Sequence, residues 1–174
     1  MQPFRAATRK SLLTVHVLAS VGWFGAVAAF LAIAIVGVSA PDSVAVAGIY
    51  AALDVLIWAV IVPLSLLTLA SGILQAVGTP RGLLRYYWVV AKLLLTFVAT
   101  VVLLIHTGAV DAAAAAAMHP SMDIDAMGVQ LVVDSAAALV VLVLATVLSI
   151  VKPRGTTPWA TRPVDRSADS DVRD

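Results

Sequence analysis

Apolar and polar positions alternate along this chain in long blocks. Four almost wholly apolar blocks, separated by short segments that hold charged residues, proline or glycine, cover residues 11–38, 45–77, 86–110 and 127–151. A helix rises ~1.5 Å per residue, so about 20 apolar residues cross the hydrocarbon core of a bilayer. Each block exceeds this length, and the pattern therefore predicts four membrane-spanning helices.

The short connections between the blocks indicate how these helices pack. Sequential helices joined by short loops become antiparallel neighbours. The predicted fold class is all-α, a transmembrane up-down four-helix bundle within residues 11–152. Small residues such as Ala99 and Ala138 predict close approach of helices in lipid. Pro63 predicts a kink near Ala59, because proline removes one backbone donor.

The basic residues outside the apolar blocks indicate an orientation. They occur before the first block, between the second and third, and after the fourth: Arg5, Arg9, Lys10, Arg81, Arg85, Lys152, Arg154, Arg162, Arg166 and Arg173. The other two connections carry aspartate but no Lys or Arg. Lys and Arg are enriched in cytoplasmic loops, so the N-terminus (1–10), the middle connection and a disordered tail (153–174) are predicted to face the cytoplasm. The expected location is the cytoplasmic membrane, as a multi-pass protein.

Composition excludes several classes of function. The chain is 61% hydrophobic and 12% charged, whereas soluble domains are roughly 45–50% apolar and about 25% charged, so the lipid bilayer is its expected partner. A net charge of +1 gives no support for nucleic-acid binding. The chain has no Cys, which excludes thiolate chemistry and disulfides.

The sequence does not identify a catalytic residue or decide whether the protein is an enzyme. It contains no glycine-rich phosphate loop, no nucleophile elbow and no HExxH motif. Four spans are few for a complete transporter, which leaves open association into a homo-oligomer or with another membrane protein.

Ionisable residues inside the apolar blocks are the candidates for function. A charge at the centre of a span costs ~2.5–3.5 kcal/mol on insertion scales, so each one requires a partner, access to water or a function. In three blocks an ionisable residue is the first or last member of a series of residues spaced alternately four and three apart. Residues with this spacing lie on one face of a helix, and that face can point into the bundle. The faces are His16, Ser20, Trp23, Val27 and Phe30; Asp54, Trp58, Ile61, Ser65, Thr68, Gly72 and Gln75; and Lys92, Thr96, Ala99, Leu103 and His106.

His16 and Lys92 are predicted to form a site near the cytoplasmic side. His16 lies six residues after Lys10 and Lys92 seven after Arg85, so both lie ~10 Å from the basic anchors. One interpretation is axial ligation of haem b or a proton-handling pair. The other is that His16 bonds a neighbouring helix and Lys92 extends toward water.

Asp54, His106 and Asp134 are predicted to lie nearer the outer face. A proton relay or a cation site is one interpretation of these residues, and simple hydration close to the membrane surface is the other. The connection that follows His106 adds Met118, His119 and Met122. Thioether and imidazole ligands suit copper, but methionine also makes ordinary apolar contacts. His106, Asp134 and these three residues form the alternative metal hypothesis.

Two short motifs resemble those of known membrane families. The segment from His16 to Trp23 and Phe24 is similar to the first span of the HemJ-type protoporphyrinogen oxidases, which are haem-binding four-helix proteins. The segment from Trp88 to Lys92 resembles their Trp-x-x-x-Lys motif. This resemblance implies that His16 and Lys92 are the functional pair of a tetrapyrrole site, with Trp23 and Trp88 nearby.

Two other groups share parts of the pattern. The first span, with His16 followed by Trp23 and Gly25, also resembles the CopD-type copper-resistance membrane proteins, which agrees with the copper hypothesis. Across much of residues 12–110, including the segment 71–88, the chain resembles a group of actinobacterial four-span membrane proteins, and that resemblance implies no activity. A non-catalytic membrane scaffold, in which the polar residues serve helix packing, stays the third hypothesis.

Overall fold

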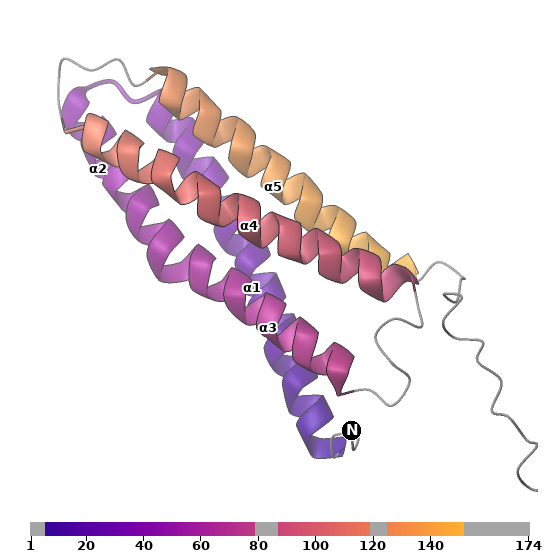
Figure 1. The fold of residues 1–174 in the computed structure, drawn as a ribbon. Helices are drawn as coiled ribbons and strands as arrows, with labels where there is room; N and C mark the ends of the chain where they lie inside the picture. The colour runs from indigo at the N-terminus through magenta and orange to yellow at the C-terminus, as the bar shows by residue number, and fades with distance from the viewer. Residues whose placement is uncertain (1–5, 79–86, 119–124, 152–174) are drawn as a thin grey trace, which may run out of the picture.

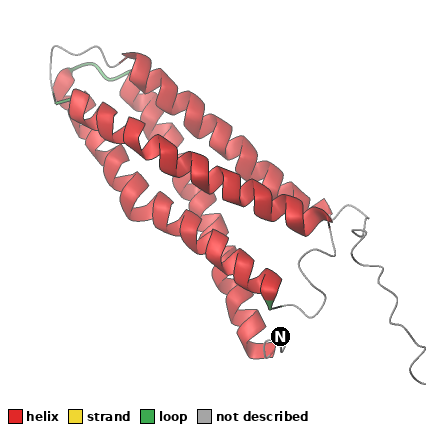
Figure 2. Ribbon diagram, viewed as in Figure 1, coloured by secondary structure: helices red, strands yellow, loops and turns green. Residues whose placement is uncertain are grey.

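The computed structural model describes residues 6–78, 87–118 and 125–151 of the 174-residue chain. These residues form long helices with short loops and no strand (Figure 2). The elements are α1 (Ala6–Val38), α2 (Ser43–Leu56), the π-helical turn η1 (Ile57–Ile61), α3 (Val62–Val77), α4 (Tyr87–Ala116) and α5 (Asp125–Val151). Because α2, η1 and α3 follow one another without a break, they form a single span.

The predicted all-α bundle of four long apolar helices is confirmed. Four helical segments in the described part of the chain are long and apolar enough to cross a membrane. Helix α1 begins at Ala6 rather than near residue 11, and α4 continues to Ala116 rather than ending near 110. Alanine has the highest helix propensity, which explains why the alanine-rich segment after residue 110 extends α4. The orientation in the membrane stays a prediction, and the tail at 153–174 lies outside the described residues.

The second span contains the π-helical turn directly before Pro63. Pro63 has no N–H to offer the carbonyl of Ala59, four residues earlier. Immediately before it, the N–H of Val62 bonds the carbonyl of Ile57, five residues back, which is the π-type spacing. The irregularity predicted near Ala59 takes the form of this widened turn.

The interior face predicted for the second span is wrong upstream of Ile61, because of the widened turn. Uniform helical spacing upstream of Ile61 places Asp54 and Trp58 on that face. In the structure Leu53 and Ile57 are buried, and Trp58 is 48% exposed. The π turn contains one extra residue, which shifts the helical phase by one position. The residues that point inward are therefore Leu53 instead of Asp54 and Ile57 instead of Trp58.

Helix α1 occupies the centre of the packing and contacts α2, η1, α3 and α5. Figure 1 shows α1 running beside α3, and α4 beside α5, with the two pairs diverging toward the N-terminal end of α1. The buried core lies in the half of the bundle near the connection between α1 and α2. Its larger members are Trp23, Val27, Phe30, Tyr50, Leu53, Ile57, Ile61, Val110 and Leu131.

The outer surface of the helices carries many exposed apolar side chains. Leu18 is 67% exposed, Ile105 70% and Ile150 75%. Soluble monomers rarely expose large continuous apolar surfaces, but in lipid such side chains meet a solvent as apolar as themselves. The exposed surface therefore agrees with the membrane-spanning lengths of the helices.

Candidate functional site

A cavity of about 240 Å³ lies between α1, η1, α4 and α5. Its walls are mostly aliphatic and aromatic. The lining residues with polar side-chain atoms are Trp23, His106, Asp134 and Ser135. The facing surfaces of α4 and α5 contribute the small side chains of Ala99, Ala137 and Ala138. Because these methyl groups do not reach across the bundle, they leave the space that forms the cavity.

The π turn contributes directly to the cavity wall. Ile57 and Ile61, the first and last residues of η1, both line it. Trp23 and Phe30 supply aromatic surface from α1. Single π turns within α-helices are frequent at functional sites, and here the turn brings Ile57 to the cavity in place of Trp58.

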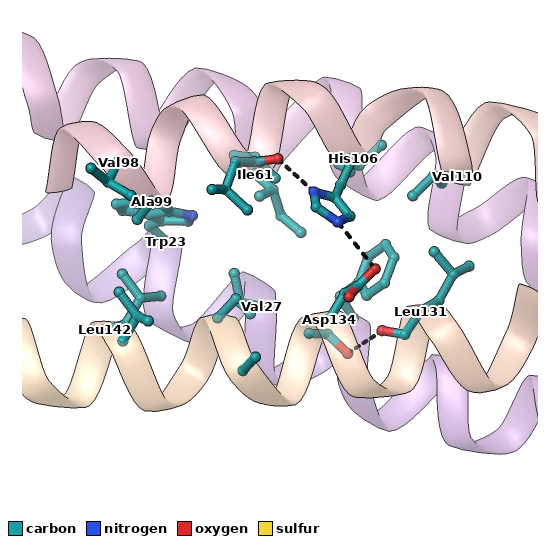
Figure 3. Close-up of a pocket in the computed structure, with 18 of the residues that line it drawn as sticks. Trp23, Val27, Ile61, Val98, Ala99, His106, Val110, Leu131, Asp134 and Leu142 are labelled. Carbon is teal, nitrogen blue, oxygen red and sulfur yellow. Dashed lines mark hydrogen bonds and ion pairs between the residues drawn. The ribbon is translucent and has the colours of Figure 1, made fainter. Parts of the chain in front are cut away.

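His106 on α4 and Asp134 on α5 face each other at the cavity (Figure 3). The Nε2 atom of His106 lies 3.5 Å from Oδ2 of Asp134, and the side chains are 37% and 33% exposed. The Nδ1 atom of His106 lies 2.8 Å from the carbonyl oxygen of Val102. A carbonyl oxygen only accepts, so Nδ1 carries a proton and Nε2 faces the carboxyl group. Asp134 lies nine residues into α5, ~13 Å from its start.

Two buried polar atoms of the cavity residues make no hydrogen bond to the described part of the chain. They are Nε1 of Trp23 and Oδ2 of Asp134. Figure 3 shows the indole of Trp23 between α4 and α5, with its nitrogen on the side toward His106. An unsatisfied buried donor or acceptor costs about 1–3 kcal/mol, so these atoms favour a partner beyond the described residues, such as a bound ligand. Ser135 differs, because its hydroxyl donates to the carbonyl of Leu131 at 2.7 Å.

His16 is half-buried on the side of α1 that faces α3, and it bonds to α3. Its Nδ1 atom is 3.1 Å from the carbonyl oxygen of Thr68 and 3.0 Å from the hydroxyl of Ser71. Since that hydroxyl donates to the carbonyl of Leu67 at 2.6 Å, it accepts from His16. Nδ1 is therefore the protonated nitrogen, and Nε2 of the neutral ring keeps its lone pair. A Cβ on Gly72 would lie 3.3 Å from the ring, so glycine lets the imidazole pack closely on α3.

The other residues predicted for the tetrapyrrole site are only partly gathered around His16. Lys92 is half-buried and close enough to His16 for a Coulombic interaction. Trp23 lines the cavity described above, whose lining includes neither His16 nor Lys92. Trp88 belongs to α4, but its side chain lies outside the described residues. The structure thus places the charge of Lys92 within electrostatic range of His16 and places Trp23 at a different site.

The outer acidic residues form two separate pairs. Asp134 faces His106, whereas Asp54 lies within hydrogen-bonding reach of Asp111. The indole of Trp58 donates to Asp111 at 2.9 Å. The sequence did not predict this contact with Asp111, because regular helical spacing placed Trp58 on the interior face of the second span.

The metal hypothesis gains no ligand set from the described residues. Among residues 6–78, 87–118 and 125–151, no group of three or more His, Cys, Asp or Glu could hold a metal ion. Met118 is 68% exposed at the end of the described segment. His119 and Met122 lie outside the described residues, so their predicted contribution to a copper site stays a prediction.

Four long helices with apolar outer surfaces define this chain as a multi-pass, all-α integral membrane protein. No protein-family model matches the sequence, and comparisons with curated proteins and with solved structures also find no match. The function must therefore be inferred from the chemistry of the sites themselves.

Proposed function

We propose that this membrane protein binds a small lipid-soluble molecule in the cavity between α1, η1, α4 and α5. The observation that supports this function is a mostly apolar cavity of about 240 Å³ with one ionisable pair, His106 and Asp134, in its wall. Ligand sites combine apolar walls with a few polar groups that orient the ligand. The cavity has this composition.

A purely structural function explains the pair less well. A charge-assisted hydrogen bond between nitrogen and oxygen is normally 2.7–2.9 Å long, whereas His106 and Asp134 are 3.5 Å apart. Ionisable groups within a span are costly and usually mark a functional pathway or site. A pair that is expensive to bury, loosely joined and placed at a cavity is better suited to contacting a ligand than to holding α4 against α5.

A cavity-filling substitution tests this function. Ala138→Trp should occupy the space and reduce the saturable labelling of cavity residues by a photoreactive alkylphenol, in nanodiscs, by about tenfold or more. Labelling is counted as saturable when excess unlabelled 4-butylphenol displaces it, which separates the cavity from lipid-facing background. Ala138 lines the cavity, so the added indole competes directly with the probe.

The matched control is Val140→Trp on the same helix. Val140 is 60% exposed, so this substitution adds an indole to the lipid-facing surface and should leave the labelling unchanged. Equal saturable labelling of wild type and Ala138→Trp would exclude the cavity as the binding site.

The orientation of His16 favours a second candidate function, binding of haem b or a related tetrapyrrole. Metal-ligating imidazoles usually donate their other N–H to a carbonyl or a similar acceptor, and haem iron is commonly held by histidine. The Nδ1 contacts of His16 with Thr68 and Ser71 fit this arrangement. The neighbouring Lys92 and the motif resemblance to haem-binding oxidases add support.

The absorption spectrum of protein purified from haem-replete cells tests this candidate. A Soret band is expected in wild type, and His16→Ala should abolish it because the proposed iron ligand is removed. His106→Ala is the matched control, since it deletes an imidazole outside the His16 site, and should keep the band. A colourless wild-type preparation, or an unchanged band in His16→Ala, would remove haem from the account.

A further inference from the structure

The protonation of the His106–Asp134 pair follows from its hydrogen-bond geometry. Nδ1 of His106 is committed to the carbonyl of Val102, so a neutral ring presents the lone pair of Nε2 to Asp134. Two facing lone pairs repel each other, and an ionised carboxylate beside a neutral ring would leave a net charge in an apolar cavity, which is costly. One proton for the pair, carried by either Nε2 or Oδ2, removes both problems. In that state the pair is neutral overall.

A neutral pair with one shared proton can both donate and accept a hydrogen bond. At 3.5 Å the two atoms are farther apart than a direct charge-assisted bond requires, so their hydrogen-bonding capacity is not used up by each other. A hydroxyl group matches this capacity, because its single oxygen both donates and accepts. Ethers, ketones and esters only accept, and an ammonium group only donates.

The size and walls of the cavity restrict the rest of the ligand. An engineered apolar cavity of about 150 Å³ holds a benzene molecule, and this cavity is about 240 Å³, which leaves room for one ring and a short alkyl chain. Trp23 and Phe30 in the wall can pack edge or face against an aromatic ring. The unpartnered indole N–H of Trp23, which is 4% exposed, offers a second donor to a ligand oxygen.

We infer that the ligand is a neutral, lipid-soluble phenol or alcohol about the size of one substituted ring, with its hydroxyl bound by His106 and Asp134. This inference rests on the proposed binding function of the cavity. Because Oδ2 of Asp134 is buried against His106, the two side chains part as the hydroxyl enters and exchanges hydrogen bonds with both. A charged headgroup is disfavoured, since it would leave the occupied cavity with a net charge.

Two probes of nearly equal shape test the inference. In nanodiscs, 4-butylphenol should displace the photoreactive probe from wild-type protein at a membrane concentration about tenfold lower than 4-butylanisole, which corresponds to one hydrogen bond of about 1.4 kcal/mol. The anisole has the same ring and chain but cannot donate. Asp134→Leu should remove the preference. Thr146→Val on the same helix should retain it, since Thr146 lies outside the cavity lining and its hydroxyl is bonded to Leu142.

The outcomes separate this inference from the function on which it rests. Equal displacement by the phenol and the anisole in wild type, with both blocked in Ala138→Trp, would overturn the hydroxyl preference and leave the cavity as a binding site. Displacement by neither probe would overturn both. The comparison of the phenol with the anisole, which decides the hydroxyl preference, is made in wild-type protein. It therefore does not depend on whether any variant folds.

Discussion

Replacing Gly128 by alanine is expected to destabilise the protein by about 1–3 kcal/mol, the usual cost of overpacking. Gly128 lies in α5, and a Cβ there would collide with the Tyr50 hydroxyl and lie 3.0 Å from a methyl group of Val38. Tyr50 is 2% exposed, and its ring also packs against Gly37. Because the ring lies between two glycines, it has little room to move away. Thermal unfolding in detergent, followed by circular dichroism, measures the change.

The control uses a glycine with open space around it. A Cβ on Gly108 in α4 would have no neighbour within 4 Å, and alanine is the better helix former by about 1 kcal/mol, so Gly108→Ala should maintain or raise stability. Tyr50→Phe should reduce the cost of Gly128→Ala, because the colliding atom is absent in that background. If Gly128→Ala unfolds at the wild-type temperature, the close packing of α1, α2 and α5 around Tyr50 is wrong.

The fold could be predicted from hydrophobic block length alone, because only helices of about 20 apolar residues satisfy their own backbone groups in lipid. The interior faces could be predicted only where the helix is regular. The buried positions Trp23, Val27 and Phe30 follow the expected spacing in α1. In the second span the π turn shifted the phase, and Trp58 faced outward. The sequence gives no sign of this one-residue change in the hydrogen-bond pattern except the nearby proline.

The sequence identified the ionisable residues of the candidate sites and grouped His106 with Asp134, but it did not predict the contacts of Asp54 or Trp23. His16, Lys92, His106 and Asp134 were identified because ionisable side chains within apolar blocks are costly to place in a membrane and therefore require a partner or a function. The contacts that were not predicted depend on helix rotation, which the sequence does not specify. The cavity was also unforeseen, since Ala99 and Ala138 predicted close helix contact and instead line an open space. Small side chains permit close approach, but whether the helices approach depends on the larger residues in the neighbouring layers.

The shared proton of His106 and Asp134 predicts an unequal response to removal of either partner. His106→Leu leaves the Asp134 carboxyl group in an apolar cavity, where it must stay charged without a partner or take up a proton, and should lower stability by about 1–3 kcal/mol. Asp134→Leu should cost less, because the remaining neutral imidazole keeps its bond to Val102. Thermal unfolding of both variants in nanodiscs at neutral pH gives the comparison.

The variant that combines both substitutions gives the more decisive test of the pair. Removing both polar groups leaves no unpaired group behind, and paired substitutions of this kind are often neutral or stabilising. His106→Leu with Asp134→Leu should therefore be more stable than the sum of the two single changes predicts, by an interaction energy of about 0.5–3 kcal/mol. Thr146→Val, which changes an exposed α5 residue outside the cavity lining with its own backbone partner, should add independently to either single change. Strictly additive effects of the His106 and Asp134 substitutions would mean that the two groups share no proton, and the argument for a hydroxyl ligand would lose its basis.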